Sequence, residues 1–347
     1  MPGSEVKSYP VRGIPFPFGN HRLQDLFRYR SPLNLPPALT TDLLAWRPTI
    51  VHFHFVHLPQ AIRLARRLRQ HDIPYCVTPH GGLSIEAQRR SRLGKIVFGR
   101  LFERGYLNAA AFLHAISTED VEGARAYGAR NRFVLAPNCI DPSLLPREVD
   151  ETFVRRRLPE IAERRLFVYL GRIDPEQKGL DMLLRAWAGL PSRDDIALVL
   201  VGPDWREGRA RLKALVDALG IADSVKFLEP VSGSEKWALL AGSDVFVHPS
   251  RWEAGVPFSV LEAMLAAKPL LVTKPADPDG LLAPAEAGDV VFPDEESIRD
   301  GLFGLADAEV AELNRRGRAA YDLVISTFNW ESTARKLLDA YGDAVSN

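Results

Sequence analysis

Short apolar segments rich in β-branched residues recur along this chain, and longer amphipathic segments lie between many of them. Apolar residues run almost continuously through each short segment, which is typical of strands buried on both faces. These segments occur at 49–55, 75–78, 111–116, 132–136, 166–171, 197–202, 224–228, 244–249 and 269–273. Helical periodicity marks 60–71, 179–190 and 208–220. The alternation predicts an α/β protein with doubly wound parallel sheets.

A polar, proline-bearing passage at 141–165 has no strand pattern and interrupts this alternation. We interpret it as the connection between two domains, which predicts domains at 1–150 and 151–325 followed by a C-terminal segment at 326–347 with an amphipathic helix. Residues 1–48 contain many prolines and no clear unit of strand, glycine and helix. We therefore expect that segment to be mostly irregular.

The composition suits a globular protein of about two domains. Of the 347 residues, 46% are hydrophobic and 25% are charged, and the sequence shows neither a membrane-spanning apolar run nor the basic and apolar start of a signal peptide. We expect a cytoplasmic protein. Its two cysteines, Cys76 and Cys139, lack metal-binding or redox spacing, so free thiols are predicted.

The formal net charge of zero hides an asymmetry between the two parts of the chain. Residues 1–140 carry 19 Lys and Arg against 9 Asp and Glu, whereas residues 141–347 carry 25 against 35. Either the basic part contacts an anionic partner, such as the inner face of a membrane, or the two parts attract each other. Basic and apolar residues also alternate at 86–107, which indicates an interfacial helix or an ordinary surface helix.

Two cations, Arg172 and Lys178, lie in a loop that follows the apolar segment 166–171 and precedes a predicted helix. Ligands of doubly wound sheets bind at such carboxyl ends of strands. The two side chains could hold a diphosphate and stabilise the charge that grows on it as a leaving group. The alternative interpretation is a solvated basic turn.

Two other strand ends offer backbone contacts. Gly202 ends the segment 197–202 and allows a ligand to approach the backbone closely. After the segment 244–249, Pro257 suits the first turn of a helix, whose positive end attracts anions. The amides available there belong to Gly255, Val256 and Phe258.

Two glutamates flank this turn, with Glu253 before the helix and Glu262 within it. An ionised carboxylate can accept two hydrogen bonds, which is how proteins hold vicinal hydroxyls of sugars. A sugar diphosphate carries such hydroxyl pairs on both sides of its phosphates, so one glutamate for each sugar is chemically sensible. Alternatively, Glu253 caps the helix and Glu262 lies on the surface.

Histidine and aspartate residues provide further candidates. His80 is followed by two glycines and could contact a ligand, although a lone histidine is more often structural. His52 and His54 share a strand face, and Asp277 and Asp279 form an Asp-X-Asp sequence, but no further metal ligands accompany either pair. We expect no metal. The sequence also lacks the motifs of P-loop, serine hydrolase and dinucleotide enzymes.

Eight segments, in this order, resemble the family 4 glycosyltransferases of the GT-B fold. They are VTPHGG, LHAIS, APNCID, YLGRIDPEQKGLDMLLRAW, LVLVGPD, VKFLEP, LLAGSDVFVHPSRWEAGVPFSVLEAM and FNWESTARKLLDAY. The resemblance covers about 48–342 and is more specific in the second half. It implies two Rossmann-like domains facing a cleft, a nucleotide sugar held mainly by the second, and a C-terminal helix that crosses back to the first. It also implies metal-independent transfer with retention of anomeric configuration.

The resemblance also assigns roles to single residues. It implies that Arg172 and Lys178 bind the diphosphate, that Glu253 contacts the donor sugar and that Glu262 binds the ribose. His80 matches a position near the transferred sugar. Eight residues lie between the two glutamates, one more than is usual in the family, which predicts a bulge in the loop before the helix. The family's opening strand and glycine-rich loop near the acceptor are not found in 1–48.

The expected activity is retaining transfer of a hexose-type sugar from a nucleoside diphosphate sugar to a hydroxyl of a glycan or lipid-linked acceptor. Polysaccharide biosynthesis is the expected setting, without a cofactor, a metal or a nucleic-acid partner. Catalysis would rest on Arg172, Lys178, Glu253 and His80. Two alternatives remain open: a non-catalytic sugar-nucleotide-binding subunit that needs a partner chain, and a sugar-nucleotide epimerase.

Overall fold

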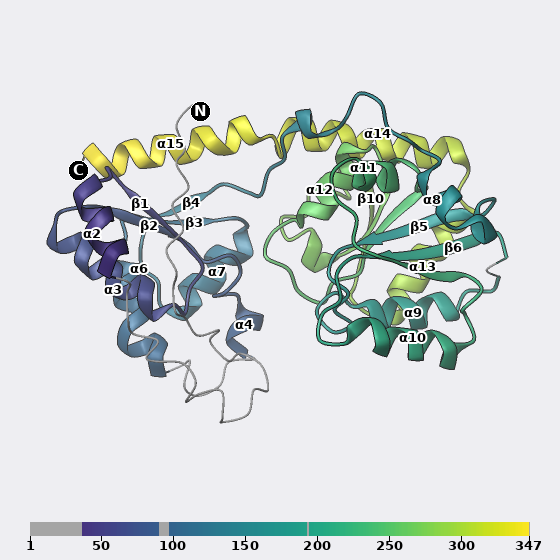
Figure 1. Ribbon diagram of the computed structural model, residues 1–347, viewed down its shortest axis with the longest axis horizontal. Helices are drawn as coiled ribbons and strands as arrows, with labels where there is room; N and C mark the ends of the chain where they lie inside the picture. Colours follow the sequence, from purple (N-terminus) through teal and green to yellow (C-terminus); the bar gives the residue numbers. More distant parts are fainter. Residues whose placement is uncertain (1–36, 90–96, 193, 347) are drawn as a thin grey trace. The chain divides into compact units, whose positions relative to one another are not determined.

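The computed structural model describes residues 37–89, 97–192 and 194–346, which form two α/β units (Figure 1). The first unit takes in the described residues up to Ala115, together with Asp120–Leu135 and the chain from Leu337. The second unit takes in Ile116–Glu119 and Ala136–Lys336. The domain boundaries drawn from the sequence at 150 and 325 stay predictions.

The first unit is built on a four-stranded parallel sheet in the order β1, β2, β3, β4. Its strands are β1 (Val51–His54), β2 (Tyr75–Thr78), β3 (Phe112–Ala115) and β4 (Phe133–Leu135). One face packs against α3 (Pro59–Gln70), α6 (Arg104–Asn108) and α7 (Thr118–Tyr127). The other face packs against the second half of α15 (Trp330–Ser346), where Ala340 contacts a cluster formed with Cys76 and Phe112. Every residue of β2 and β3 is buried, as a strand covered on both faces requires.

The second unit is a six-stranded parallel sheet in the order β10, β9, β8, β5, β6, β7. Its strands are β5 (Arg165–Leu170), β6 (Ile196–Val201), β7 (Val225–Leu228), β8 (Val245–His248), β9 (Leu270–Thr273) and β10 (Gly288–Val291). Alternate residues of β5 enter different cores: Leu166 and Val168 face one, and Phe167 and Tyr169 face the other. The sheet is therefore covered on both sides, as the continuous apolar segments predicted.

Helices supply the two covering layers of this sheet (Figure 1). On one side lie α9 (Leu180–Ala188), α10 (Gly208–Leu219) and α13 (Glu295–Asp307). On the other lie α8 (Phe153–Arg157), α11 (Gly233–Ala241), α12 (Phe258–Leu265) and much of α14 (Val310–Thr327). Short 3-10 turns occur at Pro142–Leu144, Pro159–Ile161 and Lys274–Ala276.

The chain reverses its direction of winding between β5 and β8. From β5 it proceeds outward through β6 and β7, and it then returns to β8 on the other side of β5 before continuing to β9 and β10. In open α/β sheets, ligands bind beyond the carboxyl ends of the strands at such a switch point. The loops after β5 and β8 therefore define where a site is expected in this unit.

The structure corrects the sequence analysis in two places. Part of the segment expected to be irregular is the helix α2 (Pro37–Trp46), which begins at a proline that the first turn of a helix tolerates. No residue of α2 is fully buried, and only Leu43 and Leu44 pack partly against the core of the first unit, so its helical pattern is weak. The edge strand β10 was also missed, because it is short and contains Gly288 and Asp289. The glycine-rich loop sought in 1–48 falls mainly on residues outside those described.

The basic stretch at 86–107 contains several short helical segments in its described part. They are the end of α4 (Ile85–Arg89), a π-helical turn at Gly99–Glu103 and α6, while 90–96 lie outside the described residues. Among the helices described, none is long and apolar enough to cross a membrane. Whether this stretch lies at an interface stays a prediction. Both cysteines are free thiols, as predicted, with Cys76 buried and Cys139 partly buried.

Candidate functional site

The loops at the carboxyl ends of β5 and β6 are in close backbone contact. Gly202 has a φ of 146°, and a Cβ placed on it would lie 1.8 Å from the carbonyl oxygen of Gly171. The amide of Ile173 donates to the carbonyl oxygen of Pro203 at 2.8 Å. Only glycine permits this approach, so the role of Gly202 seen in the structure is to join the two loops.

The loop after β5 is joined equally closely to the loop after β8. A Cβ on Gly179, whose φ is 64°, would lie 2.0 Å from the carbonyl oxygen of Pro249. Arg251 makes a bidentate ion pair with Asp181 of α9, at 2.7 and 2.9 Å, which is the strongest geometry for such a pair. The two loops that flank the switch point are thus held together by both backbone and side-chain contacts.

Glu253 receives three hydrogen bonds at one carboxylate oxygen. Lys178 Nζ, His248 Nε2 at 2.9 Å and Ser250 Oγ all donate to its Oε1. The side chains of Lys178 and Glu253 are only 11% and 9% exposed, so the ion pair is largely removed from water. Burial raises the pKa of the Glu253 carboxyl, but His248 and Lys178 together outweigh it and lower that pKa to about 2. The glutamate is therefore an ionised group held in a fixed position.

His248 is a site residue that the sequence analysis missed. It ends β8 and is 1% exposed, and burial lowers its pKa despite the hydrogen bond and charge of Glu253. A neutral imidazole that donates from Nε2 leaves Nδ1 unprotonated, and Nδ1 has no hydrogen-bond partner among the residues described. The sequence did offer one signal for His248, because it is a polar residue at the end of an otherwise apolar strand.

Arg172 is held by two neighbours rather than by a carboxylate. Its Nη2 donates to Gln177 Oε1 at 2.8 Å, and its guanidinium carbon lies 4.6 Å from the ring centroid of Trp205. Its carbonyl oxygen accepts a hydrogen bond from Tyr169 Oη at 2.8 Å. Both cations of the loop after β5 are thus at the carboxyl end of the sheet, with different partners.

The helix α12 begins at Phe258, one residue after Pro257, which was expected in its first turn. Pro257 is its N-cap, and the chain bends at 254–256 with Gly255 at a φ of 73°. Val256 is buried, whereas Phe258 is 58% exposed at the first helical position. The structure shows a bend in the loop where the family's spacing predicted a bulge, while the alignment of both glutamates and anion binding by these amides stay predictions.

Glu262 lies on α12 and contacts a different cation. Lys236 Nζ of α11 donates to Glu262 Oε1 at 2.6 Å, and the glutamate side chain is 17% exposed. It is neither a surface residue nor fully enclosed. Lys236 was not recognised from the sequence, because a lysine on an amphipathic helix carries no signal of its own.

His80 lies in the first unit, at the end of β2 and with a φ of 49°. Its Nε2 is 2.9 Å from Nδ1 of His54, and the two rings are stacked. Behind them, His52 Nε2 contacts Thr78 Oγ1 at 2.6 Å, and Thr78 Oγ1 contacts His114 Nδ1 at 2.8 Å. The carboxyl ends of β1, β2 and β3 thus carry a polar cluster that the separate sequence motifs did not show as one feature.

We expect this histidine cluster to make the stability of the protein depend on pH. Burial, followed by the charges of His54, His114 and His80, lowers the pKa of His52 to about 3. As pH falls below about 6.5, the unfolded chain binds a proton that the folded chain does not, so this contribution to stability is lost towards acid. Between pH 7 and 4.5 the free energy of unfolding should fall in both proteins. We expect it to fall by about 1 kcal/mol less in His52→Gln than in the wild type, after allowance for partial exposure.

The measurement is the free energy of urea unfolding at both pH values. His71→Gln is the control, because His71 is exposed. If the wild type and His52→Gln lost equal stability between pH 7 and 4.5, His52 would not contribute to the pH dependence, and the prediction would be wrong.

Asp277 serves as a turn residue in the structure, whereas Asp279 binds the first residue of α7. The Asp277 carboxylate accepts the amides of Leu281 and Leu282 at 2.9 and 3.1 Å, and Asp279 accepts the amide and hydroxyl of Thr118. Among the residues described, no group of three or more His, Cys, Asp or Glu is placed to hold a metal ion. The contacts of Asp277 favour the turn interpretation of the Asp-X-Asp sequence.

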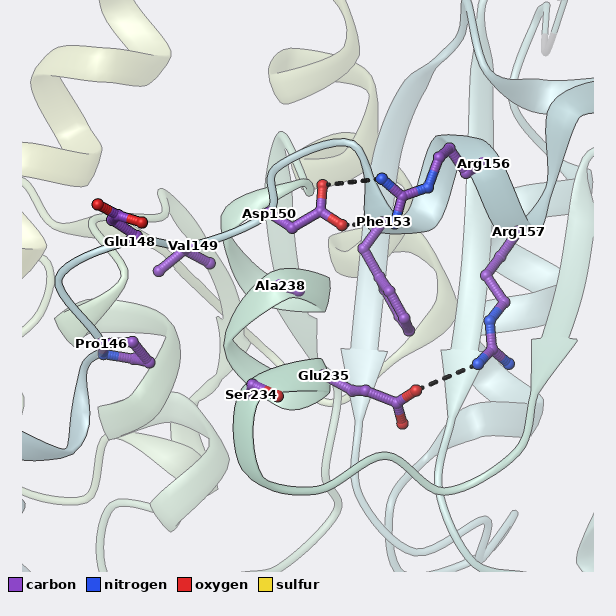
Figure 2. Close-up of a pocket in the computed structure, with 10 residues that line it drawn as sticks. All are labelled: Pro146, Glu148, Val149, Asp150, Phe153, Arg156, Arg157, Ser234, Glu235 and Ala238. Atoms are coloured by element: carbon purple, nitrogen blue, oxygen red, sulfur yellow. Dashed lines mark hydrogen bonds and ion pairs between the residues drawn. The ribbon is translucent and has the colours of Figure 1, made fainter.

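A separate groove of about 640 Å³ lies in the second unit (Figure 2). Four of its charged groups form two pairs: Arg156 points to Asp150, with 2.6 Å between Nη2 and Oδ2, and Arg157 points to Glu235 at 3.2 Å. The remaining lining residues are Pro146, Glu148, Val149, Phe153, Ser234 and Ala238. None of the predicted site residues lines this groove.

Two family models match the chain. The model described as "Glycosyl transferases group 1" matches residues 150–322, and the one described as "Glycosyl transferase 4-like domain" matches residues 2–139. Together they take in both halves of the chain. The chain belongs to the family 4 glycosyltransferases, which confirms the family predicted from its motifs.

Curated relatives carry glycosyltransferase names. The D-inositol 3-phosphate glycosyltransferase of Salinispora tropica is 30% identical over 207 residues, which are 56% of this chain and 42% of that protein. The MMP alpha-(1->4)-mannosyltransferase of Mycolicibacterium hassiacum is 26% identical over 227 residues, or 65% of this chain and 54% of that protein. The chain spans about half the length of the curated relatives it matches.

Solved structures of glycosyltransferases share the fold. HepE of Anabaena, in complex with UDP and glucose, has a TM-score of 0.75 at 19% identity, covering 88% of this chain and 82% of that one. Sucrose-phosphate synthase of Thermosynechococcus elongatus has a TM-score of 0.73 at 21% identity, covering 89% and 78%. These likenesses confirm the predicted GT-B fold.

Proposed function

We propose that this protein transfers a hexose-type sugar, with retention of configuration, from a nucleoside diphosphate sugar to a hydroxyl of a glycan or lipid-linked acceptor. The observation that carries the proposal is the buried contact between Lys178 and Glu253 at the switch point of the second sheet. A buried ammonium and a fixed, ionised carboxylate, aligned where ligands of this fold bind, suit a negatively charged sugar phosphate.

In the proposed reaction the bond between the anomeric carbon and the diphosphate oxygen breaks. Negative charge grows on the departing diphosphate, and Arg172, Lys178 and the N-terminal amides of α12 stabilise it more strongly than they stabilise the bound donor. The acceptor hydroxyl attacks the same face of the sugar, and its proton passes to the departing phosphate. These cationic and helix-end groups would supply the charge neutralisation without a metal ion.

In this proposal the carboxylates of Glu253 and Glu262 bind the two sugars of the donor. Glu253 Oε1 is occupied by Lys178, His248 and Ser250, so the donor sugar would meet the carboxylate through its Oε2. Glu262, held by Lys236, would accept the ribose hydroxyls. His80 would lie near the transferred sugar, as the resemblance implies.

The names of similar proteins guide the choice of substrates. HepE was solved with UDP and with UDP-glucose, so UDP-glucose is the first donor to test. Relatives named for inositol phosphate and phosphatidyl-myo-inositol make polyol and lipid-linked acceptors sensible candidates in polysaccharide or glycolipid assembly. A lipid-linked acceptor also suits the exposed arginines of α3, whose opposite face is buried. Contact with the inner face of a membrane stays a prediction.

Nucleotide binding tests the proposed donor site. We expect one of UDP, GDP and ADP, at about 100 times its Kd and without metal, to raise the Tm of the wild type by about 5 °C. Arg172→Ala and Glu262→Ala should each lose most of this shift, because each removes a predicted ligand of the nucleotide. Arg156→Ala, which breaks an exposed ion pair in the groove of Figure 2, is the matched control.

Activity assays carried out beside this binding experiment separate the alternatives. A wild-type protein that none of the nucleotides stabilises would contradict the donor site. A protein that binds nucleotide but transfers no sugar to any acceptor without a second chain would be the non-catalytic subunit. Interconversion of the donor sugar in the absence of acceptor would identify an epimerase.

A further inference from the structure

Trp205 presents an exposed indole at the carboxyl end of β6. The side chain is 39% exposed, although tryptophan is usually highly buried. The guanidinium carbon of Arg172 lies 4.6 Å from the ring centroid, which is within the range of a cation–π interaction. An aromatic side chain therefore covers one face of the cation expected to bind the diphosphate.

The loop around Trp205 is held at both ends. Before it, Asp204 forms a parallel bridge with Ile173 of the loop after β5, and its Oδ1 accepts the amide of Arg209 at 2.7 Å. The Arg209 guanidinium also donates to the carbonyl oxygens of Gly202 and Leu228, both at 2.9 Å. The indole is thus carried on a segment that is tied to the loop of Arg172 itself.

The backbone after Trp205 is locally strained. Arg206 and Glu207 have φ values of 52° and 61°, in the left-handed region that is unfavourable for a non-glycine residue. Strain of this kind persists only where surrounding contacts determine it, and it concentrates near functional sites. Here the strained turn follows directly after the residue that stacks on Arg172.

We propose that Trp205 is a positioning residue for Arg172. The indole fixes the plane of the guanidinium from one side, and Gln177 Oε1 holds Nη2 at 2.8 Å, which leaves the remaining N–H donors for an anion. A free arginine side chain has many rotamers, so holding it before the ligand arrives lowers the entropy cost of binding and charge stabilisation. This inference rests on the proposed function, because it assumes that Arg172 meets the diphosphate.

The first readout is structural and needs no substrate. In the wild type, the ring current of Trp205 should displace the Arg172 Nε–H NMR signal from the arginine average, and Arg172→Lys identifies that signal by its loss. Trp205→Leu should return the signal to the average, whereas Trp205→Phe should keep much of the displacement. Trp330→Phe, a second exposed tryptophan of the same unit, is the control and should leave the signal unchanged.

The second readout is affinity for UDP, GDP and ADP, measured by calorimetry. For the nucleotide that binds the wild type, we expect Trp205→Leu to raise Kd by about 5- to 20-fold and Trp205→Phe by less than about threefold. With a working donor, Trp205→Leu should lower kcat more than it raises KM, because Arg172 acts mainly on the departing diphosphate. Circular dichroism and Tm show whether each variant is folded.

The outcomes distinguish this inference from the proposed function. If Arg172→Ala weakens binding but Trp205→Leu does not, the positioning role is wrong and the donor site stands. An Arg172 signal that Trp205→Leu leaves in place also overturns the positioning role. If the wild type binds none of the three nucleotides, the proposed function and this inference fall together. Rescue by phenylalanine but not by leucine supports the stacking role, since a requirement for apolar volume alone would be met by both.

Discussion

Replacing Lys178 by methionine is expected to lower kcat by about two to three orders of magnitude and to leave the protein folded. The ammonium of Lys178 is aligned with Glu253 where the departing diphosphate is proposed to lie. Removing one fixed donor of this kind commonly costs a factor of about 10² to 10³ in kcat, because it acts on charge that develops in the transition state. The measurement is kcat and KM for the donor, with UDP-glucose as the first substrate.

Stability and activity should separate in a double variant. Lys178→Met leaves the buried Glu253 carboxylate without its cation, although His248 and Ser250 still donate to it. We expect a loss of about 1–3 kcal/mol in the free energy of unfolding. Adding Glu253→Gln neutralises the orphaned charge and should recover part of that stability, but no activity. Wild-type turnover in the single variant, or recovered turnover in the double variant, would show that Lys178 has a purely structural role.

The largest effect on stability is expected at Gly202. Its φ of 146° and the 1.8 Å approach of a Cβ to the Gly171 carbonyl oxygen mean that Gly202→Ala must separate the loops after β5 and β6. Because backbone atoms cannot yield as a flexible side chain can, we expect a loss of about 3–5 kcal/mol and displacement of the loop that carries Arg172. The measurement is the free energy of unfolding of the second unit in urea, with tryptophan fluorescence as the probe.

Gly220→Ala is the matched control for this substitution. Gly220 also has a positive φ, 64°, but a Cβ there would meet no atom within 4 Å. Its cost is the left-handed backbone conformation alone, about 1 kcal/mol. If the two variants lost equal stability, the close approach at Gly171 would not be what Gly202 is required for.

The strands were largely predictable because burial on both faces leaves a simple pattern. The segment 75–78 coincides with β2, and 197–202 differs by one residue from β6. Every position of these strands is buried, so each reads as a mainly apolar run, bounded by proline in β2 and by aspartate and glycine in β6. β10 was missed because its residues are only partly buried and it lies at the sheet edge. Because an edge strand is partly exposed, fewer of its residues need to be apolar, and the apolar run that marks a strand in the sequence is weaker.

Some of the site was also visible in the sequence. Arg172, Lys178 and Glu253 all follow apolar segments, and parallel strands bring their carboxyl ends to one edge of the sheet. A bulge before α12 was predicted from the family's usual spacing of the two glutamates, and the loop does bend there. Trp205, Lys236 and His248 were missed, because each acts on another site residue through a contact that depends on its three-dimensional neighbours.

The sequence by itself determined the class of fold, the family and the loops in which ligand-binding residues occur. These features depend on local patterns: apolar runs, turn residues and short motifs, which the chain carries wherever it folds. Only the tertiary structure decided which of these residues meet. Lys178 and Glu253 are 75 positions apart in the sequence, and they touch because β8 pairs with β5 rather than with its sequence neighbour β7. Strand order is set by the packing of whole layers, which no short stretch of sequence encodes.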